Sequence, residues 1–436
     1  MSQRTPWLAL VTRRVRGAGR KPRRPGWFKY LAVLGPGIIA AAAGNDAGGI
    51  ATYSTVGAQY GYQLLWAMVL ITVSLTVVQE MVARLGAVTG KGLSDLIREQ
   101  FGVRWTAFAM LALLVANAGT TTSEFAGVAA AMELFGVSKY LSVPVAAVII
   151  WWLVAKGSFG RVERLFLVMS LIAVTYIVSA FLAHPDWGAV LSHTVVPTVR
   201  WDAGFLVMFV ALVGTTITPY MQIYQQSSIV EKGVTAREYG LARLDVVTGV
   251  LFSDLVSYFI IVATGATLFF QGTRVETAAD AAAALAPVAG PFASTLFAIG
   301  LLGASVLAAG VLPIATAFPI CEAFGWEAGM SRDIGDAPMF YGIFTGMIAL
   351  GALVTLIPGL PLIQLQIVVQ VINGLLLPIE LVFITLLASN HDLLGRFTNG
   401  RGFAGLAWII TVVVGALALA LVVITVVLPM FGIQLG

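Results

Sequence analysis

The sequence predicts an all-α polytopic membrane protein made of two inverted five-helix repeats and an eleventh transmembrane helix. Of its 436 residues, 59% are hydrophobic and 11% are charged, whereas a soluble globular protein carries more than twice that charged fraction. Eleven apolar windows are long enough to span a bilayer. Two of these windows, five apart in order, are interrupted by glycine and proline, which is the third observation that supports this fold class.

Windows of about 20 apolar residues define the predicted spans. We expect one transmembrane domain over 31–431, preceded by a basic cytoplasmic segment, 1–30. The first repeat covers about 31–184, the second about 204–388, and the extra helix about 404–431. The eleven spans are 31–58, 62–86, 105–131, 141–157, 163–184, 204–230, 244–271, 291–320, 338–358, 361–388 and 404–431.

Basic residues predict the orientation, because Lys and Arg accumulate on the cytoplasmic side. Nine lie before residue 30, with no acidic residue among them. If the N-terminus is cytoplasmic, eleven spans place 22 of the 25 basic residues on the cytoplasmic side and leave only Lys139, Arg200 and Arg274 outside. The same count of spans places the C-terminus outside. An anionic-lipid patch, a nucleic-acid arm and a signal peptide are other interpretations of the basic segment. A topology determinant is the simplest, and we expect no nucleic-acid partner.

The first interruption places a carboxylate inside an apolar span. Asp46 lies in the run from Gly44 to Gly49, and an ionised carboxylate at mid-membrane costs at least about 2.5–3.5 kcal/mol. The glycines favour unwinding, which leaves backbone carbonyls without helical partners. A bound cation satisfies both groups, so we expect Asp46 to ligate a metal ion. Helix capping is the alternative.

The second interruption, Gly214–Pro219, lies in the sixth span, which begins the second repeat. Inverted repeats with broken first helices are the arrangement of LeuT-like transporters, whose substrate site lies between the two breaks. Unwound backbone is tolerated at membrane depth only where it lines a cavity or is buried in protein. Each break alone is open to interpretation as a packing kink, but the pair, with an acid at one of them, predicts a transport site.

Several motifs outside the breaks resemble those of the NRAMP divalent-metal transporters. The stretch Gln79–Leu93, with Arg98 after it, is the most specific, and the resemblance extends from about Leu34 to Trp408. It implies a divalent metal ion as substrate, residence in the lipid bilayer, no cofactor and no obligate protein partner. Further matches are Gly35–Gly37, Gly57–Tyr62, Leu65–Trp66 and Ser389–Asn399.

The chain departs from the family where the resemblance places the metal. The Asp-Pro-Gly-Asn motif of the first helix appears as Asp46 to Gly49, so the acid is kept and the Asn ligand is lost. The Met-Pro-His motif of the sixth helix appears as Thr218-Pro219-Tyr220, so a hydroxyl replaces the thioether. At other aligned positions, Thr121 replaces an Asp, Gln225 replaces a second His, and Glu124 keeps a Glu.

These changes favour magnesium. A thioether favours Mn²⁺, Fe²⁺ and heavier ions, and Thr218 removes it. Gly49 and Thr218 also widen the pocket, which suits Mg²⁺, an ion that keeps several waters. The pattern is similar to the NRAMP-related magnesium transporters, a prokaryotic branch, which implies the inner membrane. The expected metal-site residues are Asp46, Ala43, Gly49, Thr215, Thr218 and Gln370, with Ala43 and Thr215 acting through backbone carbonyls.

Two of these assignments have plain alternatives. Thr218 is equally able to hydrogen-bond its own helix backbone, as membrane Thr residues often do. Gln370 resembles a family glutamine that approaches the metal, but a buried Gln also bonds neighbouring helices. For the pathway, we expect Tyr220 to fill the volume of the missing His, and Gln79 to lie near the ion route.

The sequence predicts entry without proton coupling. All three histidines fall in predicted loops, and span nine contains no Arg, although the family usually has basic residues in its proton route there. Glu124 is the group that would restore coupling. A proton-coupled Mn²⁺ or Fe²⁺ importer is therefore the main rival.

Other functions fit less well. An amino-acid carrier of the same fold is disfavoured because Asp46 would repel the substrate carboxylate. A transport-dead sensor stays open. The chain has no His-Glu-x-x-His or comparable zinc motif, so we expect no enzyme.

Two further acids fall within predicted spans. Asp254 lies in the seventh and Glu380 in the tenth, and the family motifs explain neither. Either would line an aqueous vestibule or lie near a helix end with solvent access. We favour solvent access for Glu380 and leave Asp254 open.

Overall fold

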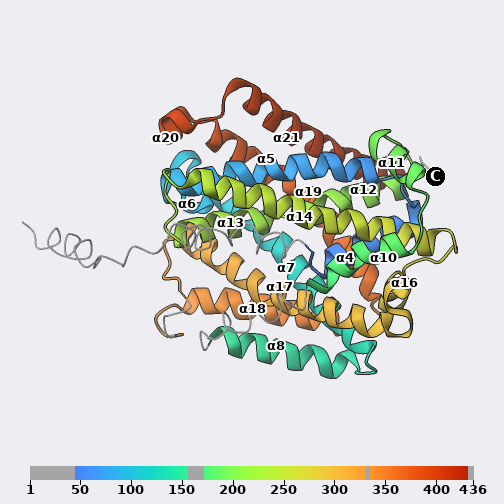
Figure 1. The fold of residues 1–436 in the computed structure, drawn as a ribbon. Coiled ribbons are helices and arrows are strands. Elements are labelled where there is room, and N and C mark those ends of the chain that lie inside the picture. Colours follow the sequence, from blue (N-terminus) through green and yellow to red (C-terminus); the bar gives the residue numbers. More distant parts are fainter. Residues whose placement is uncertain (1–44, 156–170, 330–333, 431–436) are drawn as a thin grey trace, which may run out of the picture.

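The computed structural model describes residues 45–155, 171–329 and 334–430, and every regular element in these ranges is helical (Figure 1). The predicted all-α fold class is confirmed. The elements are α4 (Ala47–Tyr60), α5 (Leu65–Thr89), α6 (Leu93–Phe101), α7 (Val103–Glu133), α8 (Lys139–Ala155), η1 (Leu171–Val174), α10 (Thr175–Leu182), α11 (Trp187–Val195), α12 (Ala203–Thr216), α13 (Pro219–Glu231), α14 (Tyr239–Thr264), η2 (Gly265–Phe269), α15 (Ala278–Ala283), α16 (Ala286–Ala289), η3 (Gly290–Phe292), α17 (Ala293–Phe324), α18 (Pro338–Thr355), α19 (Leu362–Ala388), α20 (His391–Leu394), η4 (Gly395–Phe397), α21 (Arg401–Val422), η5 (Val423–Val427) and α22 (Leu428–Met430).

Eight stretches of the described chain are long and apolar enough to cross a membrane. They contain α5, α7, α12 with α13, α14, α17, α18, α19 and α21. The other three predicted spans overlap the shorter helices α4, α8 and α10. All three of these spans, 31–58, 141–157 and 163–184, lie partly outside the described residues, and the segment 1–30 lies entirely outside them. The chain is a multi-pass membrane protein.

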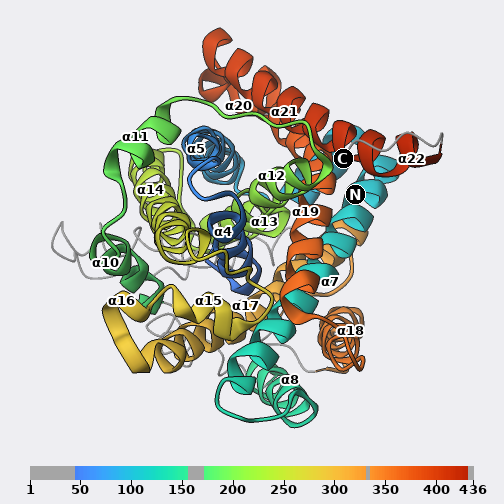
Figure 2. The same cartoon turned by 90° about the vertical axis from the view of Figure 1, so that its right-hand side faces the viewer.

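Helix α4 lies near the centre of the bundle (Figure 2). It packs against α7, α12, α14, α17 and α19. The helices α8 and α18 lie together along one edge, and α21 lies at the opposite edge (Figures 1 and 2). The N-terminus of α4 is therefore surrounded by helices from both halves of the sequence.

The predicted break in the sixth span is confirmed. Helix α12 ends at Thr216, after which Ile217 (φ −111°, ψ 61°) and Thr218 (φ −70°, ψ 139°) leave the helical conformation. Pro219 then begins α13, at a position where its missing N–H costs no helical hydrogen bond. For the first span, the structure describes the part from Asn45 onward, in which α4 begins at Ala47.

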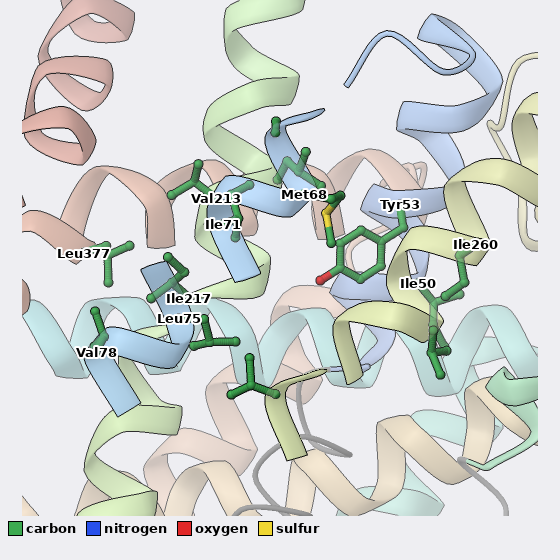
Figure 3. Close-up of a cluster of buried hydrophobic side chains, with 14 of the residues drawn as sticks. Ile50, Tyr53, Met68, Ile71, Leu75, Val78, Val213, Ile217, Ile260 and Leu377 are labelled. Carbon is green, nitrogen blue, oxygen red and sulfur yellow. The ribbon is translucent and has the colours of Figure 1, made fainter. Parts of the chain in front are cut away.

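Apolar side chains hold the break among its neighbours. Figure 3 shows Ile217 in one cluster with Leu75 of α5, Tyr53 of α4 and Leu377 of α19. Ile217 is 1% exposed, so this short non-helical segment is buried in protein. Burial meets the condition under which irregular backbone is stable at membrane depth.

Candidate metal site

Asp46 caps the N-terminus of α4. Its backbone is extended (φ −69°, ψ 178°), and its Oδ1 accepts a hydrogen bond of 2.7 Å from the N–H of Gly49. The capping alternative is therefore correct for this oxygen. The Oδ2 atom is buried and has no hydrogen-bond partner among the described residues. One carboxylate oxygen holds the helix end, and the other remains for a ligand.

Glu124 brings a second carboxylate to the same helix end. It lies in the middle of α7, and its Oε2 accepts a hydrogen bond of 3.3 Å from the N–H of Ala47. Its Oε1 is buried without a partner in the described chain. The helix dipole of α4 stabilises negative charge at this end, but two ionised carboxylates at one helix end would also repel each other. A cation between the two unpaired oxygens would relieve that repulsion.

Helix α19 supplies Gln370 next to these acids. The close approach is visible at Gly48, where a side-chain β-carbon would collide with the Gln370 amide and lie 3.0 Å from the Ser123 hydroxyl. The Gln370 Oε1 accepts a hydrogen bond of 2.9 Å from Asn373 on its own helix, and its Nε2 has no partner within the described ranges. The alternative of a bond to a neighbouring helix is not observed for Gln370 among the described residues. The amide is positioned against the first turn of α4.

The break in the sixth span contributes Thr215 and Thr218. Both Oγ1 atoms are buried, with no hydrogen-bond partner in the part of the chain that the structure describes. Thr218 is the N-cap residue of α13 and makes no capping bond, so the expected alternative of a bond to its own backbone is wrong. The Thr215 carbonyl lies four residues before Pro219, which has no N–H to donate. The break therefore offers hydroxyl and carbonyl oxygens.

Contacts between helices bring most of these groups together. Gly214, just before Thr215, packs so closely on α19 that an added β-carbon would meet the backbone oxygen of Gln370. The hydroxyl of Tyr53 on α4 lies 3.0 Å from that of Thr216. Asp46, Glu124 and Gln370 thus meet at the first turn of α4, and the break lies beside Gln370 and beside Tyr53 in the second turn.

The chemistry of this set is that of hard oxygen ligands. Carboxylate, hydroxyl and carbonyl oxygens suit Mg²⁺ and Mn²⁺ better than soft or heavy metals. Within the described residues, no group of three or more His, Cys, Asp or Glu side chains is placed to hold a metal ion, so this set relies on two carboxylates together with neutral oxygens. Asp46, Glu124, Thr215, Thr218 and Gln370 are each at most 1% exposed, so the arrangement is closed to solvent. The predicted widening of the pocket remains a prediction.

The other predicted site residues have different surroundings. Tyr220 packs with Met221, Ala308 and Leu312 in a small buried cluster. Gln79 is buried on α5, and neither of its amide atoms is hydrogen-bonded to another described residue. Gly49 contributes its N–H, which donates the hydrogen bond that holds Asp46 Oδ1. Ala43 lies outside the described residues.

Sequence reasoning missed the groups that fix these side chains in place. The Asn45 amide donates to the Ser253 hydroxyl at 3.1 Å, and its carbonyl accepts from the Ser257 hydroxyl at 3.0 Å, which ties the start of α4 to α14. Asn373 also donates to the Thr120 hydroxyl at 2.9 Å. These polar residues on apolar spans were a detectable signal, although their partners are distant in sequence.

Comparison with known proteins gives consistent matches. A family model described as "Natural resistance-associated macrophage protein-like" (Nramp) matches residues 37–424. The "Divalent metal cation transporter MntH" of Deinococcus radiodurans is 29% identical over 405 residues, which are 89% of this chain and 89% of that protein. The protein of the same name from Ralstonia nicotianae is 30% identical over 455 residues, covering 96% and 97%.

Solved structures share the fold. A manganese transporter from Eremococcus coleocola superimposes with a TM-score of 0.71 at 21% identity, covering 95% of this chain and 91% of that one. Mhp1, a nucleobase-cation-symport-1 family transporter, gives a TM-score of 0.54 at 16% identity, covering 91% and 92%. At these identities the likeness concerns the fold alone, and it confirms the predicted LeuT-like arrangement.

Proposed function

The chain belongs to the Nramp family, and we propose that it transports divalent metal ions across the membrane by alternating access around the Asp46 site. The observation that carries this proposal is the pair of unpaired, buried carboxylate oxygens of Asp46 and Glu124 at the N-terminus of α4. The names of the relatives support the substrate class, since they are divalent metal cation transporters. The metal ion is cargo here, and no enzymatic activity is proposed.

Magnesium is the cargo that we propose as preferred, with Mn²⁺ also carried. Thr218 presents a hydroxyl at the position where the family's soft thioether is expected, and this hydroxyl is free to face an ion or its hydration water. Two carboxylates with hydroxyl and carbonyl oxygens suit an ion that retains part of its water shell. This chain therefore resembles the magnesium branch of the family at its metal-site positions.

We propose uniport driven by the membrane potential, which contributes about 4.6 kcal/mol per 100 mV to the entry of a doubly charged ion. His184 lies in a loop, His193 lies in the last turn of the short helix α11, and His391 begins the short helix α20. The rival proposal, proton-coupled import of Mn²⁺ or Fe²⁺, is favoured by one observation: the second carboxylate, Glu124, is retained beside Asp46.

The proposal also covers the membrane in which the protein lies and its orientation there. We propose a single transmembrane domain over 31–431 in the inner membrane of a prokaryote, with residues 1–30 in the cytoplasm and the C-terminus outside. The distribution of Lys and Arg supports this orientation.

The test is metal entry into liposomes containing the purified protein, followed with an internal Mg²⁺ indicator and an internal pH indicator. Asp46→Ala removes both the cap and the charge, whereas Asp46→Asn keeps an oxygen that can cap α4. We expect Mg²⁺ entry without acidification for the native chain and none for either variant. The exposed substitution Glu276→Gln should leave entry unchanged.

Two results would oppose the proposal. Transport by a folded Asp46→Asn protein would assign Asp46 a capping role alone. Entry of Mn²⁺ but not Mg²⁺, with acidification, would favour the proton-coupled importer.

A further inference from the structure

A second buried acid lies outside the metal site. Glu380 is on α19, eight residues before its end at Ala388, and lines a small cavity between α6, α7, α13 and α19. Every other residue lining that cavity is apolar, among them Ile97, Met110 and Phe383. The cavity also touches Pro219, the first residue of α13 after the break.

The carboxyl group of Glu380 has no hydrogen-bond partner in the part of the chain that the structure describes. Both of its oxygens are inaccessible to solvent and form no hydrogen bond within the described residues, although other atoms of the residue are partly exposed. The expected solvent access near a helix end is therefore wrong for this carboxyl. An ionised carboxylate in apolar surroundings is costly, and the group must either bind a cation or be neutral.

Among the described residues, no charged side chain other than Glu380 lines this cavity. The charged residues of the surrounding helices lie outside the cavity lining. Arg98 of α6 donates to the Ala323 carbonyl, and Glu99 pairs with Lys91. Glu124 of α7 bonds to Ala47. The remaining titratable or charged groups on these helices, also outside the lining, are Asp95, Arg104, Glu133, Tyr220, Tyr224 and Glu231.

The volume of the cavity limits what the Glu380 carboxyl can bind there. The volume that water can occupy in this cavity is about 20 Å³, which is close to the minimum needed for one water molecule. A Mg²⁺ ion that keeps several waters does not fit there. A proton on the carboxyl requires no added volume.

We propose that Glu380 is a proton-binding group that is neutral in this closed arrangement and ionises when α13 separates from α7 and α19. The proposal rests on the alternating-access function, in which the halves of the broken helices move. Separation would admit water to the cavity and stabilise the carboxylate, so a deprotonated Glu380 favours the open state. The proton leaves and returns on the same side, which makes transport depend on pH without moving protons across the membrane.

The first experiment measures protonation directly, without relying on transport. Infrared difference spectra of the purified protein at neutral pH, native minus Glu380→Gln, should contain the carbonyl stretching band of a protonated carboxyl group. The exposed substitution Glu276→Gln, treated in the same way, provides the background. A difference spectrum showing an ionised carboxylate in place of that band would overturn the proposal.

The second experiment measures the link to opening. Metal entry into liposomes should slow as the compartment facing α13 is acidified, by at most about tenfold per pH unit for one proton. Glu380→Gln, which is always neutral, should be slow at every pH, and Glu380→Asp should recover the pH dependence. A Glu380→Gln protein that follows the native pH profile would overturn the link. If the native chain moved no metal, the proposed function would fail, while the infrared result would still decide the protonation of Glu380.

Discussion

Single residues at the starts of α4 and α13 have polar side-chain atoms that the helix backbone does not use. Asp46 uses Oδ1 to hold the first turn of α4 and leaves Oδ2 unpaired. Thr218 occupies an N-cap position, where a hydroxyl usually bonds the helix backbone, yet its Oγ1 is unpaired. Buried polar atoms without partners are costly, so these two atoms are candidates to face the transported ion or its hydration water.

Thr218 should determine the choice between metals. We expect Thr218→Met to shift the ratio of Mn²⁺ to Mg²⁺ entry towards Mn²⁺ by roughly tenfold, about 1.4 kcal/mol, because a thioether is a soft ligand. Competition between the two ions in the liposome assay measures this ratio.

A matched variant separates sulfur from the loss of oxygen. Thr218→Val keeps the shape of the side chain and removes the hydroxyl, so it should weaken entry of both ions without favouring Mn²⁺. An equal shift in both variants would show that the thioether is not the cause.

At the scale of elements, close backbone contact fixes the break beside α19. At Gly214, an added β-carbon would collide with the backbone of both Gln370 and Gly374, and backbone atoms do not move aside as a flexible side chain does. Gly374 in turn lies against the Val210 backbone. Small residues allow such close helix packing in membranes.

The substitution Gly214→Ala should therefore destabilise the protein by about 1–3 kcal/mol, the usual cost of overpacking. Thermal unfolding of the purified protein in detergent, followed by circular dichroism, measures the change.

Gly342→Ala in α18 is the control, since nothing lies within 4 Å of a β-carbon there. It should leave stability unchanged or raise it slightly, because Ala favours a helix more than Gly. Equal unfolding temperatures for the two variants would contradict the packing argument.

At the scale of the whole molecule, the orientation is open to a direct test. The single Cys321 is buried, and Cys321→Ser provides a background without native thiols. In that background we expect Glu276→Cys to react with a membrane-impermeant thiol reagent on intact cells, because the proposed orientation places the loop after the seventh span outside. His391→Cys should react only after the cells are opened. Both positions are exposed, so the reverse pattern would invert the proposed topology.

Much of the fold could be predicted from sequence because the bilayer restricts what an apolar chain can do. A backbone in hydrocarbon must satisfy its own hydrogen bonds, so long apolar windows become helices. Glycine and proline mark the places where this regular helical hydrogen bonding is interrupted. The break found at Ile217–Thr218 falls inside the predicted 214–219 segment for this reason.

The sequence by itself determined the helical class, the second break and Asp46 as the acid at the first. Only the tertiary structure decided which buried polar atoms are paired. Glu124 meets the N–H of Ala47, 77 residues away, and Asn45 meets Ser253 across 208 residues. The same structure placed the Glu380 carboxyl in an apolar cavity, where hydropathy suggested a solvated helix end. Hydropathy is a local property of the chain, whereas pairing depends on contacts between helices far apart in sequence.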